Sequence, residues 1–351
     1  MTTSRPLLSV CIPAYNRAQV LPELLESILT QDFQDYEVVV CEDNSPERET
    51  IRSIVRQWSA GSDRIRYFEN EQNLGYDGNI RRGVSHAAGE YVVFMGNDDL
   101  MCPRALRTIA GAIGRHENVG VILRSYAGFA GTPSNIVRTA RYFETERFFA
   151  AGVRTMATFF RRSVVISGLV VHRDSATAVA TDRFDGTTLY QLYLVAHILW
   201  TRNGIFLPDI VVLYREGGTP EFGNSAAERD RFTPKAQTIE SSLTFVRGML
   251  DIAADVEGTL RVPFYLPIVR DLANYSSPIL AMHRDKGMVS FSRYALALAA
   301  LGFWRSPYFF LYFGLLLILG PTRVERLIQR AKQIVGYTPV LGRVYAGERR
   351  R

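Results

Sequence analysis

Two patterns of hydrophobic and polar positions alternate over the first 130 residues of the chain. Nearly continuous apolar runs of strand length occur at 8–12, 37–41, 65–68, 91–95 and 119–123. Segments with apolar residues at helical intervals lie between them, at 20–30, 47–59, 78–88 and 103–116. Strands without alternation are buried on both faces, which is typical of a mainly parallel sheet covered by helices. The pattern predicts an α/β fold that binds ligands at the carboxyl ends of its strands.

After about residue 127 the regular succession ends. We expect a loop over 128–135, a strand over 168–172, a helix over 187–201, a strand over 210–214 and a polar loop over 216–230. From Pro234 onward the apolar positions follow a helical period. The sequence therefore predicts an α/β domain over residues 1–230 and a helical C-terminal region over residues 231–351.

The most apolar segment of the chain, 294–320, lies in this C-terminal region. Arg305, Ser306 and Pro307 divide it into two pieces, each shorter than the roughly 20 residues of a membrane-spanning helix. The next segment, 323–334, has apolar residues at helical intervals and basic residues at other positions. We expect interfacial or re-entrant membrane helices here. The alternative is an ordinary buried helix pair with a solvated basic face.

The uneven distribution of charge indicates a partner for the C-terminal region, whereas the overall composition leaves the predicted fold unchanged. The chain is 47% hydrophobic and 22% charged, as is usual for a folded globular protein. Its net charge of +6 is uneven, because residues 286–351 contain eleven Lys or Arg and two Glu and so carry +9, against −3 for the rest. Such a basic segment indicates an anionic membrane surface as a partner. Outside it no basic patch is interleaved with aromatic residues, so no nucleic-acid binding is expected.

Cysteine usage and the N-terminus indicate the compartment. Cys11, Cys41 and Cys102 lack the spacing of a zinc site or a disulfide framework, and we expect reduced thiols. The N-terminal residues lack the apolar core of a signal peptide. The expected location is the cytoplasmic face of the inner (plasma) membrane, with the protein peripheral or monotopic.

Polar residues that could bind a nucleotide follow the first two predicted strands. The loop Pro13–Arg17 follows the first strand, and the ring of Tyr15 can stack on a planar base. Glu42 and Asp43 end the second strand, and an Asp can accept a hydrogen bond from the imide N–H of uracil or thymine. Turn chemistry explains this second loop equally well, with Ser45 as the N-cap of the next helix.

Adjacent carboxylates, Asp98 and Asp99, follow the fourth predicted strand. Two such groups repel each other unless a cation lies between them. Mg²⁺ or Mn²⁺ suits oxygen ligands and takes its remaining ligands from water and a diphosphate. The alternative is a solvent-exposed acidic turn before the helix that begins near Pro103. The sequence predicts a Mn²⁺ or Mg²⁺ site.

Four segments together resemble glycosyltransferase family 2. Members of this family have the GT-A fold and invert the configuration at the anomeric carbon of the transferred sugar. The four segments read VCIPAYN at 10–16, VVCEDNS at 39–45, NLG at 73–75, and GEY at 89–91 leading to NDD at 97–99. The resemblance covers residues 7–130 well and 165–215 loosely. It implies transfer from a nucleotide diphosphate sugar, with the metal held by Asp99 and Asp98. The residues that it assigns to nucleotide-sugar binding are Pro13, Ala14, Tyr15, Arg17, Asp43, Asn79 and Asp98.

The chain departs from the family pattern at three places. Gly96 stands where many members have a further Asp, so the acidic site has one carboxylate fewer. The segment 73–79 is more similar to the subgroup that attaches deoxyhexoses such as abequose to O-antigen precursors, where an Asn occupies the position of Asn79. The family's Glu-Asp pair, which supplies the general base, aligns here with Thr188 and Leu189.

Asp185 is the candidate general base, because it is the nearest carboxylate ahead of the helix over 187–201. The alternative role of Asp185 is a charge at the helix N-terminus. His172 and His197 are further candidates, although a single His in such apolar segments is more often structural.

The expected reaction is transfer of a sugar to a hydroxyl of a polyprenyl-linked glycan, as in O-antigen or other surface polysaccharide synthesis. One alternative is a sugar nucleotidyltransferase, which should carry a Gly-rich basic loop after the first strand, where this chain has Pro13–Arg17. The other is a non-catalytic membrane adaptor that keeps the fold.

Overall fold

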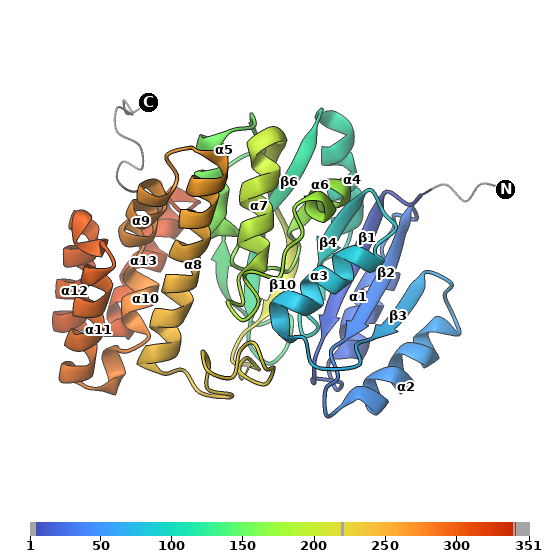
Figure 1. The fold of residues 1–351 in the computed structure, drawn as a ribbon, viewed down its shortest axis with the longest axis horizontal. Helices are drawn as coiled ribbons and strands as arrows, with labels where there is room; N and C mark the ends of the chain where they lie inside the picture. The colour runs from blue at the N-terminus through green and yellow to red at the C-terminus, as the bar shows by residue number, and fades with distance from the viewer. Residues whose placement is uncertain (1–4, 219–220, 340, 342–351) are drawn as a thin grey trace. The chain divides into compact units, whose positions relative to one another are not determined.

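The computed structural model describes residues 5–218, 221–339 and 341. The chain forms two compact units, which divide between Ala236 and Gln237. The first unit is an α/β unit built on one sheet, and the second is helical (Figure 1).

The sheet of the first unit has ten strands. Eight follow one another across it in the order β3, β2, β1, β4, β9, β6, β10 and β5, while β7 pairs with β6 and β8 with β10. All five strands expected before residue 130 are present. The bounds are β1 Leu8–Ala14, β2 Tyr36–Glu42, β3 Ile65–Glu69, β4 Tyr91–Phe94, β5 Leu100–Met101, β6 Val119–Phe129, β7 Ile136–Ala140, β8 Arg147–Phe149, β9 Val170–His172 and β10 Asn203–Arg215.

Strand direction gives a mixed sheet rather than a purely parallel one. β3, β2, β1 and β4 are parallel, and Val10 of β1 pairs with Val38 on one side and Val93 on the other. β9 lies between β4 and β6 and is antiparallel to both, while β10 is parallel to β6. The chain leaves β1 toward β2 on one side and returns to β4 on the other. This reversal is the kind of switch point at which open α/β sheets bind ligands.

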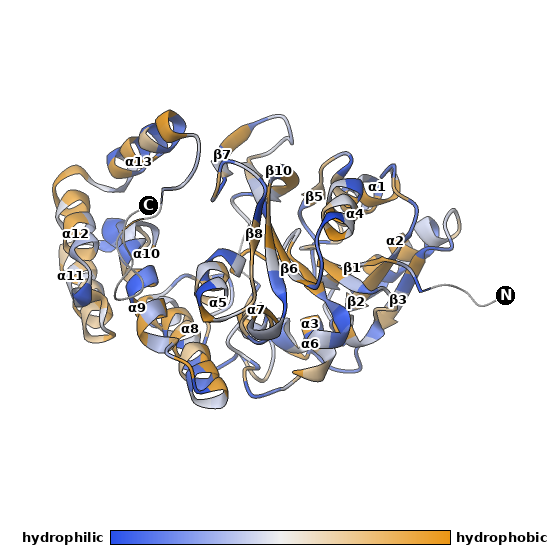
Figure 2. Cartoon of the chain, turned by 90° about the horizontal axis from the view of Figure 1, so that it is seen from above, coloured by the Kyte–Doolittle hydropathy of each residue, from blue (hydrophilic) through white to orange (hydrophobic). Residues whose placement is uncertain are grey.

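Helices cover both faces of the sheet. On α1, the side chains Leu21, Leu24, Leu25 and Ile28 recur at helical intervals and are fully buried, and Pro22 fits the first turn. The helices α1 and α4 lie on one face and α3, α6 and α7 on the other (Figure 2). The bounds are α1 Leu21–Leu29, α2 Arg48–Ser59, α3 Gly75–His86, α4 Ala105–Arg115, α5 Val153–Phe160, α6 Arg173–Ala178 and α7 Tyr190–Thr201.

Residues 127–215 are more ordered than the sequence pattern predicted. The expected loop over 128–135 begins with the last residues of β6, which continues to Phe129, and β7 follows it. β10 begins at Asn203 rather than at 210. The elements β7, β8, α5 and α6 were not predicted, because all of them are short. The two strands lie outside the main strand order, where β7 pairs with β6 and β8 with β10.

The second unit consists of helices. Thr238 and Ser241 form a capping box at the start of α8, in which each side chain bonds the other's backbone N–H. As predicted, the apolar segment 294–320 is divided into two helices. In the described ranges, no helix has both the length and the apolar composition needed to cross a membrane. The bounds are α8 Ile239–Leu260, α9 Tyr265–Asn274, α10 Ser277–Ala281, α11 Met288–Ala300, α12 Pro307–Leu319 and α13 Pro321–Val335.

Candidate functional site

Three loops meet at the carboxyl ends of β1, β2 and β4. The amide of Asn97, after β4, donates a hydrogen bond of 2.9 Å to the backbone carbonyl of Asn16, after β1. The backbone N–H of Asp43, after β2, donates to the carbonyl of Ala14 at 3.0 Å. Tyr15, Arg17, Asp43, Asp98 and Asp99 therefore lie on adjoining loops at the carboxyl ends of these strands, with Pro13 and Ala14 as the last residues of β1.

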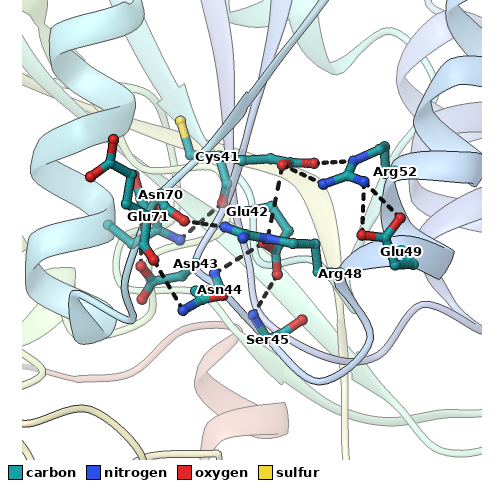
Figure 3. Close-up of polar contacts among 12 residues, drawn as sticks. Cys41, Glu42, Asp43, Asn44, Ser45, Arg48, Glu49, Arg52, Asn70 and Glu71 are labelled. Atoms are coloured by element: carbon teal, nitrogen blue, oxygen red, sulfur yellow. Dashed lines mark hydrogen bonds and ion pairs between the residues drawn. The ribbon is translucent and has the colours of Figure 1, made fainter.

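The carboxylate of Asp43 holds the turn that precedes α3. It accepts hydrogen bonds from the backbone N–H of Leu74 and Gly75, both at 2.9 Å, and from the amide of Asn70 at 2.8 Å. Burial raises the pKa of Asp43 to about 6, and these hydrogen bonds oppose that rise. Asp43 lies in a network of polar side chains that joins β2 to the segment 70–71 (Figure 3).

Glu42, directly before Asp43, organises the turn between β2 and α2. Its fully buried carboxylate accepts from the backbone N–H of Asn44 at 3.0 Å and of Ser45 at 2.7 Å, and pairs with Arg48 at 2.8 Å (Figure 3). The N-cap residue of α2 is Glu47, without a side-chain cap bond. The prediction of Ser45 as N-cap is therefore wrong, because the chain turns once more around the Glu42 carboxylate before the helix begins.

Tyr15 and Asn79 differ in their exposure to solvent. Tyr15 is partly exposed, and burial together with the charges of Glu221 and Asp43 raises the pKa of its hydroxyl. Asn79 is buried on α3, where its amide donates to the carbonyl of Cys41 at 3.0 Å and accepts from Asn70 at 3.1 Å. The Asn79 side chain thus joins α3 to β2 beneath the loop that Asp43 holds.

Asp99 is almost completely buried and firmly held. One carboxylate oxygen accepts a hydrogen bond of 2.8 Å from the backbone N–H of Arg215, and the other accepts from the hydroxyl of Ser167. The same Ser167 hydroxyl accepts from the backbone N–H of Gly96 at 2.8 Å. Burial, and then the neighbouring charge of Asp98, raise the pKa of Asp99 well above its usual range. Asp99 is therefore a fixed carboxylate whose two hydrogen bonds only partly offset the effect of burial.

Asp98 is less buried and is held differently. Its carboxylate forms an ion pair with the guanidinium of Arg17, and the exposed fractions of the two side chains are 16% and 25%. The backbone carbonyl of Asp98 accepts a hydrogen bond of 2.8 Å from Arg215, whose guanidinium also pairs with Glu23 at 2.7 Å. The structure thus brings Arg17, Asp98 and Asp99 together.

The two carboxylates suit a hard divalent cation. Both carboxylates lie close to Gly96, because a Cβ there would be 3.4 Å from an oxygen of Asp98 and 3.1 Å from an oxygen of Asp99. Oxygen ligands of this kind suit Mg²⁺ or Mn²⁺, and the unfavourable charge on Asp99 is what a cation would relieve. No three His, Cys, Asp or Glu side chains in the described ranges gather to hold a metal by themselves, so further ligands would come from water or a diphosphate.

The segment 221–232, in the expected polar loop, lies against the same edge. Glu228 is buried and accepts hydrogen bonds from the backbone N–H of Tyr76 at 2.8 Å and of Gly223 at 3.0 Å. Glu221 accepts from the Asn16 amide at 3.2 Å. This segment therefore joins the loop after β1 to the start of α3.

Asp185, the predicted base, contacts α3. Arg81 holds both of its carboxylate oxygens, at 2.5 and 2.7 Å, and also donates to the carbonyl of Thr181. The start of α7, where Thr188 stands in place of the family's acidic pair, instead receives the carboxylate of Asp77. That carboxylate accepts from the backbone N–H of Thr188 at 2.7 Å and of Tyr190 at 2.8 Å.

Asp77 was not predicted, although it is an acid in the first turn of a helix. It is buried, and burial raises its pKa to about 7 while the two backbone hydrogen bonds oppose the rise. Ser167 was missed as well, since it lies in a segment without regular pattern. Both residues act through contacts with segments distant in sequence, and a single sequence gives no local sign of such contacts.

His172 and His197, the further candidates for the general base, both contact neighbouring residues. His172 ends β9 and is the N-cap of α6, where its ring nitrogen accepts from the backbone N–H of Ser175 at 3.3 Å. Burial, and then the charge of Arg202, lower the pKa of His172 to about 4. His197 lies on α7 with its ring 4.4 Å from that of Tyr193. All three cysteines are free thiols, as predicted.

Comparisons with known proteins find a matching family model and related sequences. The sequence model of the family described as Glycosyl transferase family 2 matches residues 9–169. The chain is 39% identical over 105 residues to the GalNAc(5)-diNAcBac-PP-undecaprenol beta-1,3-glucosyltransferase of Campylobacter jejuni, a match that covers 30% of this chain and 33% of that protein. It is 26% identical over 145 residues to the uncharacterized glycosyltransferase MJ1057 of Methanocaldococcus jannaschii, covering 41% of this chain and 48% of that protein. The chain thus spans a third to a half of the length of these relatives.

Solved structures show the same fold. The crystal structure of S. aureus TarS 1–349 in complex with UDP-GlcNAc superposes with a TM-score of 0.50 at 16% identity, over 94% of this chain and 92% of that one. The central sheet therefore matches that of GT-A structures. The family match and the curated relatives show that residues 9–169 are similar to the domain of glycosyltransferase family 2.

Proposed function

We propose that the protein transfers a sugar from a nucleotide diphosphate donor to a hydroxyl of a lipid-linked glycan, with inversion at the anomeric carbon. One observation carries the proposal: the loops after β1, β2 and β4 bring Tyr15, Asp43 and the pair Asp98–Asp99 to one edge of the sheet. An aromatic ring, a buried base-reading carboxylate and a metal-binding carboxylate pair are the parts that a nucleotide diphosphate requires.

The donor would lie across the switch point between β1 and β4. Tyr15 is placed to stack on the base, and Asp43 keeps a free lone pair beside its bond to Gly75 for the imide N–H. Asp98 and Asp99 would hold Mg²⁺ or Mn²⁺, which neutralises the charge that develops on the leaving diphosphate. Asp99 is the direct ligand in this proposal, since Ser167 and Arg215 fix its orientation.

Asp185 remains the proposed general base. Arg81 keeps the carboxylate in one orientation, and lone pairs beyond the two bonds to Arg81 remain to take the proton of the acceptor hydroxyl. The Asp185 segment is fixed to α3 at both ends, because Asp77 binds Thr188 and Arg81 binds Thr181. The base would thus be anchored through Arg81 to α3, the helix whose first turn Asp43 holds.

The acceptor is proposed from the relative in Campylobacter jejuni, whose printed activity concerns a PP-undecaprenol-linked glycan. A polyprenyl-linked acceptor is presented at a membrane surface, and the helical second unit exposes Leu296, Ile318 and Ile334 to solvent. We place the protein at the cytoplasmic face of the inner membrane, in O-antigen or other surface polysaccharide synthesis. The Asn79 segment favours a deoxyhexose among the donor sugars.

The test combines binding with turnover. A thermal-shift screen of nucleotide sugars with and without Mn²⁺ should identify a donor that raises the melting temperature only with metal. Asp99→Ala should abolish both this shift and transfer, whereas Asp185→Asn should stop transfer and keep the shift. Unchanged turnover in Asp99→Ala would refute the metal assignment, and unchanged turnover in Asp185→Asn would move the base elsewhere.

A further inference from the structure

The Arg17–Asp98 ion pair lies where the proposed metal would bind. Arg17 follows β1 and Asp98 follows β4, so the pair links the two loops at the switch point of the sheet. Both side chains are partly exposed, and Gly218 adds no side chain above them: a Cβ there would lie 3.6 Å from the guanidinium and 3.7 Å from the Asp98 carboxylate. Solvent and ions can therefore reach the ion pair.

The backbone directs Arg17 toward Asp98. Asn16 and Arg17 both adopt left-handed conformations, with φ of 52° and 62°. Two consecutive non-glycine residues in this region are unusual and persist only where surrounding contacts hold them. The hydrogen bond from Asn97 to the Asn16 carbonyl is one such contact. The ion pair is thus a consequence of how the two loops are fastened.

The two carboxylates differ in how they are neutralised. Asp99 is bound by a hydroxyl and a backbone N–H, which do not carry a full charge. Arg215 lies close by, yet its guanidinium bonds the Asp98 carbonyl and Glu23. Arg17 offers a full positive charge to the Asp98 carboxylate, so a metal ion that uses Asp98 as a ligand must compete with it.

We infer that Arg17 is an exchangeable counter-ion of Asp98, which pairs with this carboxylate before the donor binds and moves to the donor's diphosphate when metal and donor arrive together. This inference rests on the proposed function. A divalent cation at Asp98 and Asp99 repels the guanidinium, and the anionic diphosphate beside it offers a new partner. Arg17 thereby opposes binding of metal alone and favours binding of metal with a nucleotide diphosphate.

The experiment measures Mn²⁺ binding to the full chain by isothermal titration calorimetry, without nucleotide and then with UDP or GDP. Without nucleotide, Arg17→Gln should bind Mn²⁺ about fivefold more tightly than the wild type, since a partly exposed competing ion pair is lost. With nucleotide, the same variant should bind the diphosphate more weakly. Arg107→Gln is the matched control, because Arg107 pairs with Asp32 on the surface, away from these loops.

Each outcome decides between the proposals. The affinity gained in Arg17→Gln should disappear when Asp99→Ala is added, which excludes binding elsewhere on the protein. Equal or weaker Mn²⁺ binding by Arg17→Gln without nucleotide, while the wild type binds Mn²⁺ with nucleotide, overturns the role of Arg17 alone. Absence of Mn²⁺ binding by every variant with either nucleotide overturns the metal assignment, and the inference with it.

Discussion

Buried acceptors of backbone N–H groups keep the strand-end loops in place. Asp43 binds two such groups before α3, Glu42 binds two before α2, and Asp77 binds two at the start of α7. A hydrogen bond to a charged group contributes about 1.5 to 3 kcal/mol. The site is therefore preorganised by the carboxylates that are least exposed, while Arg17 and Asp98 remain accessible.

Ser167 should control metal affinity through Asp99. Ser167→Ala removes the hydroxyl that bonds Asp99 and receives the Gly96 N–H. We expect about tenfold weaker Mn²⁺ binding in the presence of nucleotide, as is usual when a partner of a metal ligand is lost. Ser85→Ala is the control, since the Ser85 hydroxyl donates to the carbonyl of Arg82 on its own helix. Calorimetry that finds the Ser167→Ala affinity unchanged would show that Arg215 alone orients Asp99.

At the scale of single residues, the sequence identifies what stands at a strand end but not what touches it. Tyr15, Asp43, Asp98 and Asp99 could be predicted because the carboxyl ends of parallel strands share one edge. The partners of these residues lie far along the chain: Ser167 is 68 positions from Asp99, and Arg17 is 81 positions from Asp98. Such pairings depend on the packing of loops, which no local pattern records.

Among the secondary-structure elements, α3 contacts both Asp43, which is proposed to bind the nucleotide base, and Asp185, the proposed general base. Its first turn is held by Asp43, and Asp77 and Arg81, which lie four residues apart on one helix face, hold the segment 181–190. A shift of α3 would therefore move the nucleotide loop and the proposed base together. The loop proposed to bind the donor and the segment of the proposed base are both bonded to α3.

The start of α6 should give the protein a measurable acid sensitivity. His172 caps this helix as a neutral ring with a pKa of about 4, whereas in the unfolded chain its pKa is near 6.5. Between these values the unfolded state binds the proton and the folded state does not. This contribution to stability is therefore present above about pH 6.5 and is lost as the pH falls toward 4, by about 2 to 3 kcal/mol.

The variant His172→Asn isolates this effect. Asparagine is a good N-cap and can accept the Ser175 N–H, but it does not titrate. Urea unfolding at pH 7 and pH 5 should show a smaller loss of unfolding free energy for the variant than for the wild type. An equal loss in the two proteins would mean that other groups, rather than His172, set the acid sensitivity.

Elements with buried apolar runs could be predicted, including the three-residue strand β9, whereas the exposed or irregular short elements could not. β1 and β2 are almost entirely buried, and each has an apolar run of Val, Ile or Cys at its centre. β7 is largely exposed and β8 has only three residues, and both pair at the side of the sheet. Their formation depends on β6 and β10, which lie beside them, and so their own sequences carry little information about them.

At the scale of the whole molecule, charge and exposed apolar surface are concentrated in the second unit. The exposed fractions of Leu296, Ile318 and Ile334 are 71%, 78% and 87%. On α13, Val324 is buried, whereas Leu327 is 50% exposed. The sequence could predict these helices from their period, but the exposure of their apolar residues emerges only once the helices are packed. An apolar, basic surface of this kind fits an anionic lipid interface.

Replacement of Leu327 and Ile334 by Asp should separate membrane binding from folding. Both side chains are exposed on α13, so the changes remove apolar surface and add negative charge without opening a core. In flotation assays, the wild type should bind vesicles containing phosphatidylglycerol more strongly than vesicles of phosphatidylcholine, and added salt should weaken that binding. The double variant should stay unbound while its donor-induced thermal shift is unchanged. Val137→Asp, at an exposed position of β7, is the control. Full vesicle binding by the double variant would refute α13 as the membrane-binding helix.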